Sequence, residues 1–510
     1  MIITDHTEEE ELEKLIKKLG NRKGEFGLPG FLPELARLER IVRNLKTEDP
    51  GIPTEVERTS PNPTLQILTL SWKNLVPLVN FGTVDIIEKP EPVEEMILVW
   101  KNPITGEVMI QPASNEDLLA LKIVVEEIDP REVTKIGNVP ISSIDTLISR
   151  AVKAGILIAP APKIRREEDF PHGRGIKERF LTAEAFTLQW HITQACDLHC
   201  KHCYDRSDRS HLPLDRAIAI LDELYDFCRA RFVHGQVSFS GGNPFLYPYF
   251  DELYRAASDR GFSLAILGNP VKRAWIEEIA GIERPVFFQV SLEGLEGHND
   301  FIRGPGHFGR TIEFLDLLRD FGIYSMVMLT LTEDNLDQVM PLAEFLRGKT
   351  DLFNFNRLSM VGEGANLRLP SQKGYTAFLK RYNEAAGGNP VMGLKDNLIN
   401  ILRYRDGLEP FGGCTGHGCG AAFNFVTLLP DGEVHACRKL PSKIGNIFES
   451  SLAEIYDSEI ARCYRGGCKA CSACDIRPVC GGCLAIAHSY GLDIFREHDP
   501  FCFIDSRPGS

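Results

Sequence analysis

Three cysteines stand close together near the middle of the chain, at Cys196, Cys200 and Cys203. Their spacing, C-x3-C-x2-C, places three thiolates on one short loop. Three thiolates can bind three irons of a [4Fe-4S] cluster, which leaves the remaining iron free to bind a small molecule. Zinc fits this spacing poorly, because structural zinc sites use four ligands. The loop therefore predicts an iron-sulfur cluster with one open iron.

The elements around this loop indicate the fold that positions it. Short apolar strands alternate with helical stretches such as 214–229, 250–259 and 311–321. The expected strands are 186–192, 237–240, 264–267, 286–292, 324–331 and 352–356. Such alternation predicts an α/β fold, a parallel sheet covered by helices and closed as a full or partial barrel. Active sites of such barrels lie at the carboxyl ends of the strands, and the cysteine loop directly follows the first strand.

The loop and its context resemble the signature of the radical S-adenosylmethionine (SAM) enzymes, including the aromatic Tyr204 that follows Cys203. The resemblance implies a partial (β/α)6 barrel over residues 180–370, with Tyr204 near the adenine of SAM. It also implies that the open iron chelates the methionine end of SAM. Reductive cleavage of SAM then supplies a 5′-deoxyadenosyl radical.

A second strand end resembles the Gly-Gly-Glu-Pro motif of the same family. Ser240, Gly241, Gly242 and Asn243 occupy this place, with Asn243 where the family has glutamate. In the family, the backbone and the acidic side chain receive the SAM ammonium. An amide oxygen can accept the same hydrogen bond without charge assistance. We therefore expect Asn243 to contact SAM, and a change to glutamate to be tolerated.

Two further segments extend the resemblance. Gln289, Ser291 and Glu293 lie in a stretch that resembles the ribose-binding segment, which usually ends in Asp-Gly. Arg303 matches an arginine that reaches the SAM carboxylate in relatives. A surface-loop arginine is the alternative interpretation of Arg303.

The C-terminal part of the chain carries ten of the 14 cysteines, between Cys414 and Cys502. Their pattern resembles the SPASM domain, the auxiliary-cluster extension of radical SAM peptide maturases, although the last gap is x2 where the family has x3. A hairpin over 424–429 and 433–437 is expected to position Cys437. The resemblance implies two more [4Fe-4S] clusters, one held by Cys414, Cys419, Cys437 and Cys483 and the other by Cys471, Cys474, Cys480 and Cys502.

Two extra cysteines leave these ligand sets open. Cys463 and Cys468 are surplus, and Cys468, Cys471 and Cys474 have a ferredoxin-like spacing of their own. The assignment within 414–502 could therefore be permuted, or one auxiliary cluster could keep an open iron. A zinc ribbon or redox-active thiols are weaker alternatives. Cys228 stands apart on the apolar face of a helix and is interpreted as a packed, inert thiol.

The N-terminal third shows no sharp motif. Residues 1–63 predict two helices, at 7–19 and from Pro33, followed by a proline-rich linker at 48–63. Residues 64–165 predict a small α+β module. Its expected parts are a hairpin at 96–100 and 107–111, a helix capped by Ser114, a helix opened by Ser142 or Ser143 and ended by Gly155, and a strand at 156–158. This winged-helix-like pattern weakly resembles the peptide-recognition domains fused to peptide-modifying enzymes; a packing domain and a nucleic-acid-binding domain are the alternatives.

Length, charge and hydropathy exclude some classes of protein. The length of 510 residues suggests about three domains. We expect N-terminal helices and a linker at 1–63, the α+β module at 64–165, the barrel at 180–370, and a bridging segment with the SPASM domain at 371–510. A net charge of -14 argues against a nucleic-acid partner. The apolar runs, such as 324–331, are too short to cross a membrane. The charged residues 1–19 show no secretion signal, so we expect a reducing, cytoplasmic location.

Together these features predict a radical SAM/SPASM maturase of a ribosomally made precursor peptide with a leader. We expect SAM, three [4Fe-4S] clusters and an electron donor such as ferredoxin or flavodoxin. Residues 27–39 also resemble selenobiotic-type maturases, which favours a thioether or selenoether cross-link from Cys or selenocysteine to carbon. The alternatives are oxidation of a protein Ser or Cys, as in sulfatase maturation, a carbon–carbon cross-link, or a non-catalytic iron-sulfur electron-transfer protein. The sequence identifies no general base.

Overall fold

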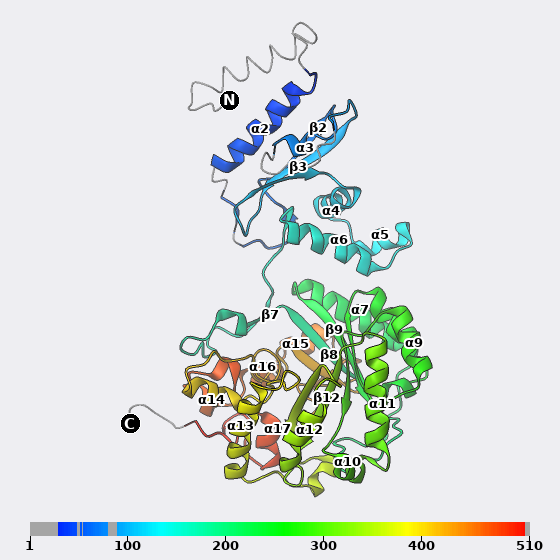
Figure 1. Ribbon diagram of the computed structural model, residues 1–510, viewed down its shortest axis with the longest axis vertical. Coiled ribbons are helices and arrows are strands. Elements are labelled where there is room, and N and C mark those ends of the chain that lie inside the picture. The colour runs from blue at the N-terminus through cyan, green and yellow to red at the C-terminus, as the bar shows by residue number, and fades with distance from the viewer. Residues whose placement is uncertain (1–28, 48–50, 54, 80–88, 505–510) are drawn as a thin grey trace. The chain divides into compact units, whose positions relative to one another are not determined.

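The computed structural model describes residues 29–47, 51–53, 55–79 and 89–504 (Figure 1). The chain divides into two compact units, Met1–Ala161 and Pro162–Ser510. The helix expected at 7–19 lies outside the described residues. None of the helices in the described ranges has both the length and the apolar character that a bilayer crossing requires.

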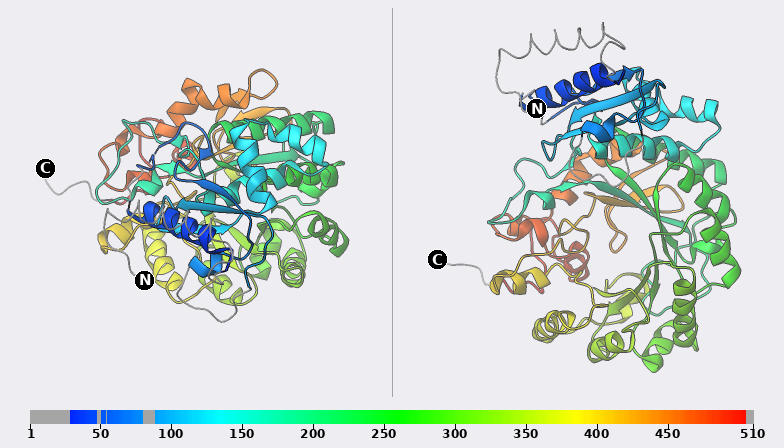
Figure 2. Two further views of the ribbon diagram at one scale, coloured as in Figure 1. Left: turned by 90° about the horizontal axis from the view of Figure 1, so that it is seen from above. Right: turned by 45° about the horizontal axis from the view of Figure 1, so that its top comes forward.

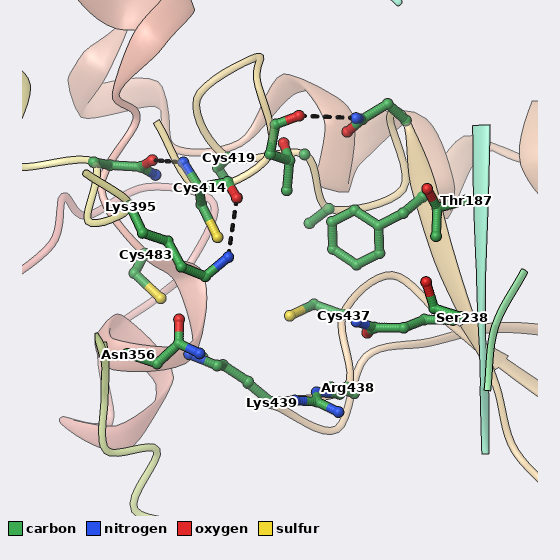
Figure 3. A pocket seen from close by; sticks show the side chains of 18 of the residues that line it. Thr187, Ser238, Asn356, Lys395, Cys414, Cys419, Cys437, Arg438, Lys439 and Cys483 are labelled. Atoms are coloured by element: carbon green, nitrogen blue, oxygen red, sulfur yellow. Dashed lines mark hydrogen bonds between the residues drawn. The ribbon is translucent and has the colours of Figure 1, made fainter. Parts of the chain in front are cut away.

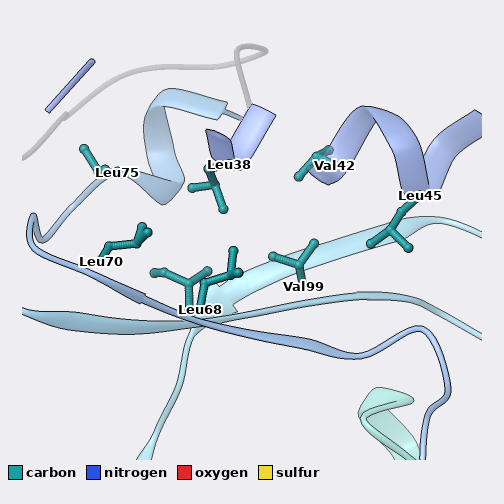
Figure 4. Packing of buried hydrophobic residues seen from close by; sticks show 8 residues of the cluster. Leu38, Val42, Leu45, Leu68, Leu70, Leu75 and Val99 are labelled. Atoms are coloured by element: carbon teal, nitrogen blue, oxygen red, sulfur yellow. The ribbon is translucent and has the colours of Figure 1, made fainter. Parts of the chain in front are cut away.

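The first unit is built on a three-stranded antiparallel sheet. Its order is β2 (Gln66–Leu70), β3 (Glu95–Lys101), β4 (Val108–Pro112), so the predicted hairpin is confirmed and β2 is an addition. Alternate residues of a strand point to opposite faces. On one face, Leu68 and Val99 pack against Leu38 and Val42 of the expected helix α2 (Leu32–Thr47), as Figure 4 shows. This helix is therefore part of the same core as the sheet.

The other face of the sheet is covered by α4 (Asn115–Val125) and α6 (Ile141–Ala154), with Leu98 and Trp100 in a second core cluster. The intervening α5 (Pro130–Gly137) packs against α6. Ser114 caps α4 in a capping box, as predicted. The prediction that Ser142 or Ser143 opens α6 is wrong. The cap is Pro140, whose extended backbone (φ -60, ψ 149) starts the helix two residues earlier.

The end of α6 follows the prediction. Gly155 has a left-handed φ of 78 and terminates the helix. The strand after it, β5 (Leu157–Ile158), pairs with β1 (Ser60–Pro61), so the end of the proline-rich segment is fixed to this unit.

The second unit contains the predicted parallel sheet. Its six strands run in the order β13-β12-β11-β10-β9-β8, and all six correspond to expected strands. Their bounds are β8 (Ala185–Thr193), β9 (His234–Gly241), β10 (Ser263–Leu267), β11 (Phe287–Ser291), β12 (Ser325–Leu331) and β13 (Leu352–Arg357). Connecting helices, among them α7 (Leu214–Ala230), α8 (Phe250–Asp259), α9 (Arg273–Ile282), α11 (His307–Asp320) and α12 (Val339–Phe345), lie along the outside of the curved sheet (Figure 2). The expected partial barrel is confirmed.

The predicted C-terminal hairpin is also present, and it extends the barrel sheet. β14 (Phe425–Leu428) pairs in parallel with β8 and antiparallel with β15 (Glu433–His435), which pairs with β16 (Lys443–Asn446). β8 would otherwise be an open edge. As a consequence, Cys437, two residues after β15, is delivered to the inside of the barrel.

The remaining C-terminal segments are short helices joined by cysteine-bearing loops. They include α13 (Gln372–Ala386), α14 (Ile399–Arg405), α15 (Leu452–Asp457), α16 (Glu459–Gly466) and α17 (Leu484–Ser489). The segment at 162–183, with β6 (Ile164–Arg165) paired to β7 (Thr182–Ala183), packs beside them. There Arg166 stacks on the ring of Phe423, 3.9 Å from its centre.

Candidate functional site

The cysteine loop lies between the end of β8 and α7, where the barrel rule expects an active site. Side chains from two neighbouring segments donate hydrogen bonds to two of its sulfurs. The Nδ2 of Asn269, just after β10, lies 3.6 Å from the Sγ of Cys196. The Nη1 of Arg303, at the end of α10 (Glu296–Arg303), lies 3.7 Å from the Sγ of Cys200. N–H donors at these positions stabilise thiolate ligands of a cluster.

A cavity of about 440 Å³ opens above this loop. It brings together most of the residues that the sequence analysis proposed for SAM and its cluster. These are Cys196, Cys200, Cys203, Tyr204, Ser240, Gly241, Gly242, Gln289, Ser291 and Arg303. The residues come from four elements, so only the barrel fold places them around one space.

The paired glycines at the end of β9 are explained by close backbone approach. Gly241 has a φ of +131, and a Cβ on it would collide with the carbonyl oxygen of Thr193. A Cβ on Gly242 would collide with the carbonyl of Ala195. The backbone N–H of Gly242 instead donates to the Thr193 oxygen at 2.9 Å. The strand end is thus held directly against the cysteine loop, which a side chain would prevent.

The structure does not place Asn243 in this cavity, in contrast to the expectation. Its side chain is 3% exposed, and its Oδ1 accepts the backbone N–H of Phe245 at 3.4 Å as a helix cap. Its Nδ2 donates to Oδ1 of Asp197 at 3.1 Å, and Asn269 donates to the same oxygen at 2.7 Å. The carboxylate at this place therefore belongs to Asp197 of the cysteine loop, and Asn243 donates a hydrogen bond to it.

Glu293 is also turned away from the cavity. It is 1% exposed, and its Oε1 pairs with Nη2 of Arg303 at 2.6 Å and lies 3.2 Å from Nε2 of His202. Its Oε2 accepts the N–H of Thr330 at 2.7 Å. Burial alone would raise the pKa of Glu293, but His202 and Arg303 hold it well below the usual range. The carboxylate thus anchors Arg303 and is not available to a ribose, contrary to the expectation.

Tyr204 lines the cavity, and its hydroxyl group takes part in a buried hydrogen bond. Its hydroxyl lies 2.9 Å from Nε2 of His191 on β8. Burial raises the pKa of Tyr204 to about 12 and lowers the pKa of His191 to about 3, so both groups are neutral at ordinary pH. The guanidinium of Arg438, which no motif had indicated, lies 5.6 Å from the centre of the Tyr204 ring.

A second cavity, of about 300 Å³, is lined by one of the two cysteine sets that the SPASM resemblance implies. Figure 3 shows the side chains of Cys414, Cys419, Cys437 and Cys483 around it. Two lysines line it as well. Nζ of Lys395 donates to the carbonyl of Cys414 at 3.1 Å, and Lys439 extends along the wall.

The two cavities adjoin inside the barrel. Residues that line both are Leu267, Gln289, Met328, Asn356, Arg357, Arg438 and Lys439. Arg357 is neutralised, because it pairs with Asp396 at 2.8 Å and with Asp499 at 2.6 Å. Arg438 and Lys439 form no side-chain ion pair or hydrogen bond with the residues that the structure describes. The space between the cysteine loop and the second cysteine set is thus cationic.

The other expected set also lies close together. Cys480 is 6% exposed, and its pKa is raised well above the ordinary value by burial and by the nearby thiols of Cys502, Cys474 and Cys471. Cys468 lies beside Cys471 as a hydrogen-bond partner, whereas Cys463 is exposed. The isolated Cys228 is 4% exposed, and burial raises its pKa to about 12, as expected of a packed thiol.

The arrangement of the cysteines fits clusters better than single ions. Within the described ranges, no three His, Cys, Asp or Glu side chains are grouped as ligands of one metal ion. Zinc requires ligands that converge on one point. In a cubane each thiolate binds a different iron, so the sulfurs surround a larger space, as those lining the second cavity do.

Comparison with known families agrees with this geometry. Residues 190–346 match the radical SAM superfamily, and residues 419–483 match the SPASM iron-sulfur cluster-binding domain. The protein is a radical SAM/SPASM enzyme.

Several curated proteins are similar to this radical SAM/SPASM enzyme. The AdoMet-dependent heme synthase of Methanosarcina barkeri is 27% identical over 351 residues, 63% of this chain and 97% of its own. The mycofactocin maturase MftC of Mycolicibacterium smegmatis is 28% identical over 333 residues, 62% of this chain and 82% of its own. The antilisterial bacteriocin subtilosin biosynthesis protein AlbA of Bacillus subtilis is 23% identical over 281 residues, 53% of this chain and 59% of its own.

A solved structure shares the fold over a longer part of the radical SAM/SPASM enzyme. Streptococcus suis SuiB bound to its precursor peptide SuiA superposes with a TM-score of 0.53 at 17% identity. The match covers 80% of this chain and 96% of SuiB. The second unit begins at Pro162 and makes up about two thirds of the chain, so the match must extend into the first unit.

Proposed function

We propose that this enzyme oxidatively modifies a ribosomally made precursor peptide and forms a thioether, or selenoether, from a Cys or selenocysteine side chain to carbon. The observation that carries the proposal is the pair of adjoining cavities. One is lined by the three-cysteine loop and the other by Cys414, Cys419, Cys437 and Cys483. A substrate residue in this space lies between a radical source and an electron acceptor.

The residues proposed to hold the cofactors follow from this arrangement. Cys196, Cys200 and Cys203 hold the SAM cluster, and the two C-terminal sets hold two auxiliary clusters. When bound, SAM and its cluster supply a radical that removes one hydrogen atom from the substrate. Forming a C–S bond from C–H and S–H also releases one proton and one electron. A cluster held by Cys414, Cys419, Cys437 and Cys483 would be the acceptor of that electron.

The chain's own contribution is to bind, orient and exclude water. Arg303 is fixed by Glu293 beside Cys200, in a position to bind the SAM carboxylate. The hydroxyl of Tyr204 is fixed by neutral His191, which orients the ring on the cavity wall. Arg438 and Lys439 carry positive charge where the cavities adjoin, which favours a peptide segment with an acidic side chain near the modified residue.

Two findings favour a peptide over a small molecule. AlbA is named as a bacteriocin biosynthesis protein and MftC as a mycofactocin maturase, and the SuiB structure contains its precursor peptide. The match to the heme synthase covers 63% of the chain, so it fits within the second unit alone. The match to SuiB covers 80% of the chain and therefore includes part of the first unit. We propose that the first unit recognises the peptide leader, that a ferredoxin or flavodoxin supplies electrons, and that the enzyme works in the reducing cytoplasm.

Co-expression with a small Cys-containing or selenocysteine-containing peptide encoded beside this protein's gene tests the proposal. Mass spectrometry should detect loss of two hydrogens per cross-link, retained after thiol alkylation. The matched control is the enzyme with Cys196, Cys200 and Cys203 changed to alanine, which should leave the peptide unmodified. Cleavage of SAM without any change in peptide mass would refute the peptide substrate, and a mass change that leaves the thiol alkylatable would refute the thioether.

A further inference from the structure

Among the residues that the structure describes, Arg477 is a buried cation without an acidic partner. It lies in the short helix Arg477–Val479, between Cys474 and Cys480, and is 2% exposed. Its Nη2 donates to the carbonyl of Gly466 at 2.6 Å, and its Nη1 finds no hydrogen-bond partner in the described part of the chain. A buried charge that is not compensated is costly, so an anion is expected close to Nη1.

Two glycines make room for this guanidinium. Gly467 and Gly481 have left-handed φ values of +66 and +68, and a Cβ on either would collide with Arg477. Gly481 lies in the run from Cys480 to Cys483, which joins one auxiliary cysteine set to the other. Nη1 therefore lies against the short segment that connects the two sets.

The backbone around Arg477 is joined to cysteines of both sets. The N–H of Arg477 donates to the carbonyl of Cys474 at 3.1 Å, and the carbonyl of Arg477 accepts from the N–H of Cys480 at 3.3 Å. The N–H of Cys419 in turn donates to the carbonyl of Cys480 at 3.1 Å. Cys419 belongs to the first set, and the other two belong to the second.

The neighbours of Arg477 do not supply the missing anion. Its guanidinium lies 4.7 Å from the ring centre of Phe170, whose ring also lies 4.6 Å from the guanidinium of Arg166. Arg166 donates only to backbone carbonyls, including that of Cys419 at 2.8 Å. Two cations thus meet at one aromatic ring, and one of them contacts the backbone of Cys419.

We propose that Arg477 is a positioning residue that places one positive charge between the two auxiliary cysteine sets and thereby raises the reduction potentials of both clusters. This inference rests on the proposed pair of auxiliary clusters. A nearby positive charge favours the reduced, more negative form of a cluster, and the low dielectric of the interior strengthens the effect. A single charge at this place links the redox properties of the two clusters.

The test is a redox titration followed by electron paramagnetic resonance. All variants carry Cys196, Cys200 and Cys203 changed to alanine, so that only auxiliary clusters contribute. In Arg477→Gln, the reduction equilibrium of each cluster should shift at least about tenfold toward the oxidised form, which is about 59 mV for one electron. Arg477→Lys should stay near the parent. Lys395→Gln is the matched control, because Lys395 lines only the first set and should shift one cluster alone.

The outcomes separate the proposals. Equal shifts in Arg477→Gln and Arg477→Lys, a shift in one cluster only, or unchanged potentials with normal iron content would overturn the role of Arg477. If Arg477→Gln does not retain iron, the Arg477→Lys variant tests the proposal. If Arg477→Lys retains both clusters, the result supports a positive charge shared by the two sets, and if it loses them, the result overturns that role. A parent protein with clearly fewer than about eight irons refutes the pair of auxiliary clusters instead.

Discussion

Changing Asn243 to glutamate, the residue that related enzymes carry, should damage this protein. Asn243 donates through Nδ2 to Asp197 at 3.1 Å, and it is 3% exposed. A glutamate at this position replaces the donor with a second carboxylate that faces the first. It also adds a methylene to a packed site and changes the cap on Phe245.

The magnitude follows from the charges and their surroundings. Two unit negative charges about 4 Å apart repel by about 4 kcal/mol at an effective dielectric constant of 20, and by about 1 kcal/mol in water. Asp197 is exposed on one side and position 243 is buried, so an intermediate value of about 2 kcal/mol is expected. Asn243→Ala loses the hydrogen bond to the charged Asp197, which is worth about 1.5–3 kcal/mol, and the cap on Phe245, but it introduces no repulsion.

Thermal unfolding and titration of SAM into reconstituted protein measure the effect. Asn243→Glu should unfold at lower temperature and bind SAM less tightly, because Asp197 adjoins Cys196 in the cysteine loop. The double change Asn243→Glu with Asp197→Asn restores one donor and one carboxylate and should recover most of the loss. Two results would refute the claim that Asn243 serves as a hydrogen-bond donor to the carboxylate of Asp197. One is that Asn243→Glu binds SAM as tightly as the parent, and the other is that adding Asp197→Asn brings no recovery.

Three further outcomes are expected. Changing Cys196, Cys200 and Cys203 to alanine should remove about four irons and leave the auxiliary clusters in place, as iron and sulfide analysis can show; loss of all iron would contradict separate ligand sets. Removing residues 1–161 should leave SAM cleavage intact but reduce modification of a full-length precursor, because affinity for the precursor is lost. If soluble protein with all its clusters no longer cleaves SAM, the first unit is part of the active core. Burial lowers the pKa of His191 from 6.5 to about 3, so the unfolded chain binds a proton that the folded chain does not. Stability of the metal-free protein should therefore fall by about 1.4 kcal/mol per pH unit as the pH drops below about 6.5, and His191→Gln should remove that part of the slope in thermal unfolding.

The sequence was sufficient to predict the barrel because its strands are short apolar runs separated by amphipathic helices. It was also sufficient to group the cysteines of the first loop, which are neighbours in the chain. It did not predict the direction in which the side chains of Asn243 and Glu293 point, because each is held by a partner from another segment. Asn243 is held by Asp197 of the cysteine loop, and Glu293 by Arg303 at the end of α10. Arg438 and Lys439 were missed because only the pairing of β14 with β8 brings them to the barrel interior.

That pairing of β14 with β8 connects the two chemical parts of the enzyme. Cys437, Arg438 and Lys439 follow β15 after one intervening residue, and β15 is hydrogen-bonded to β14, which pairs with β8. β8 in turn ends at the loop of Cys196, Cys200 and Cys203. Cys437 and the three-cysteine loop therefore both extend from one continuous sheet. Under the proposed function, a sheet that supports both loops suits a reaction in which hydrogen removal on one side of the substrate is followed by electron removal on the other.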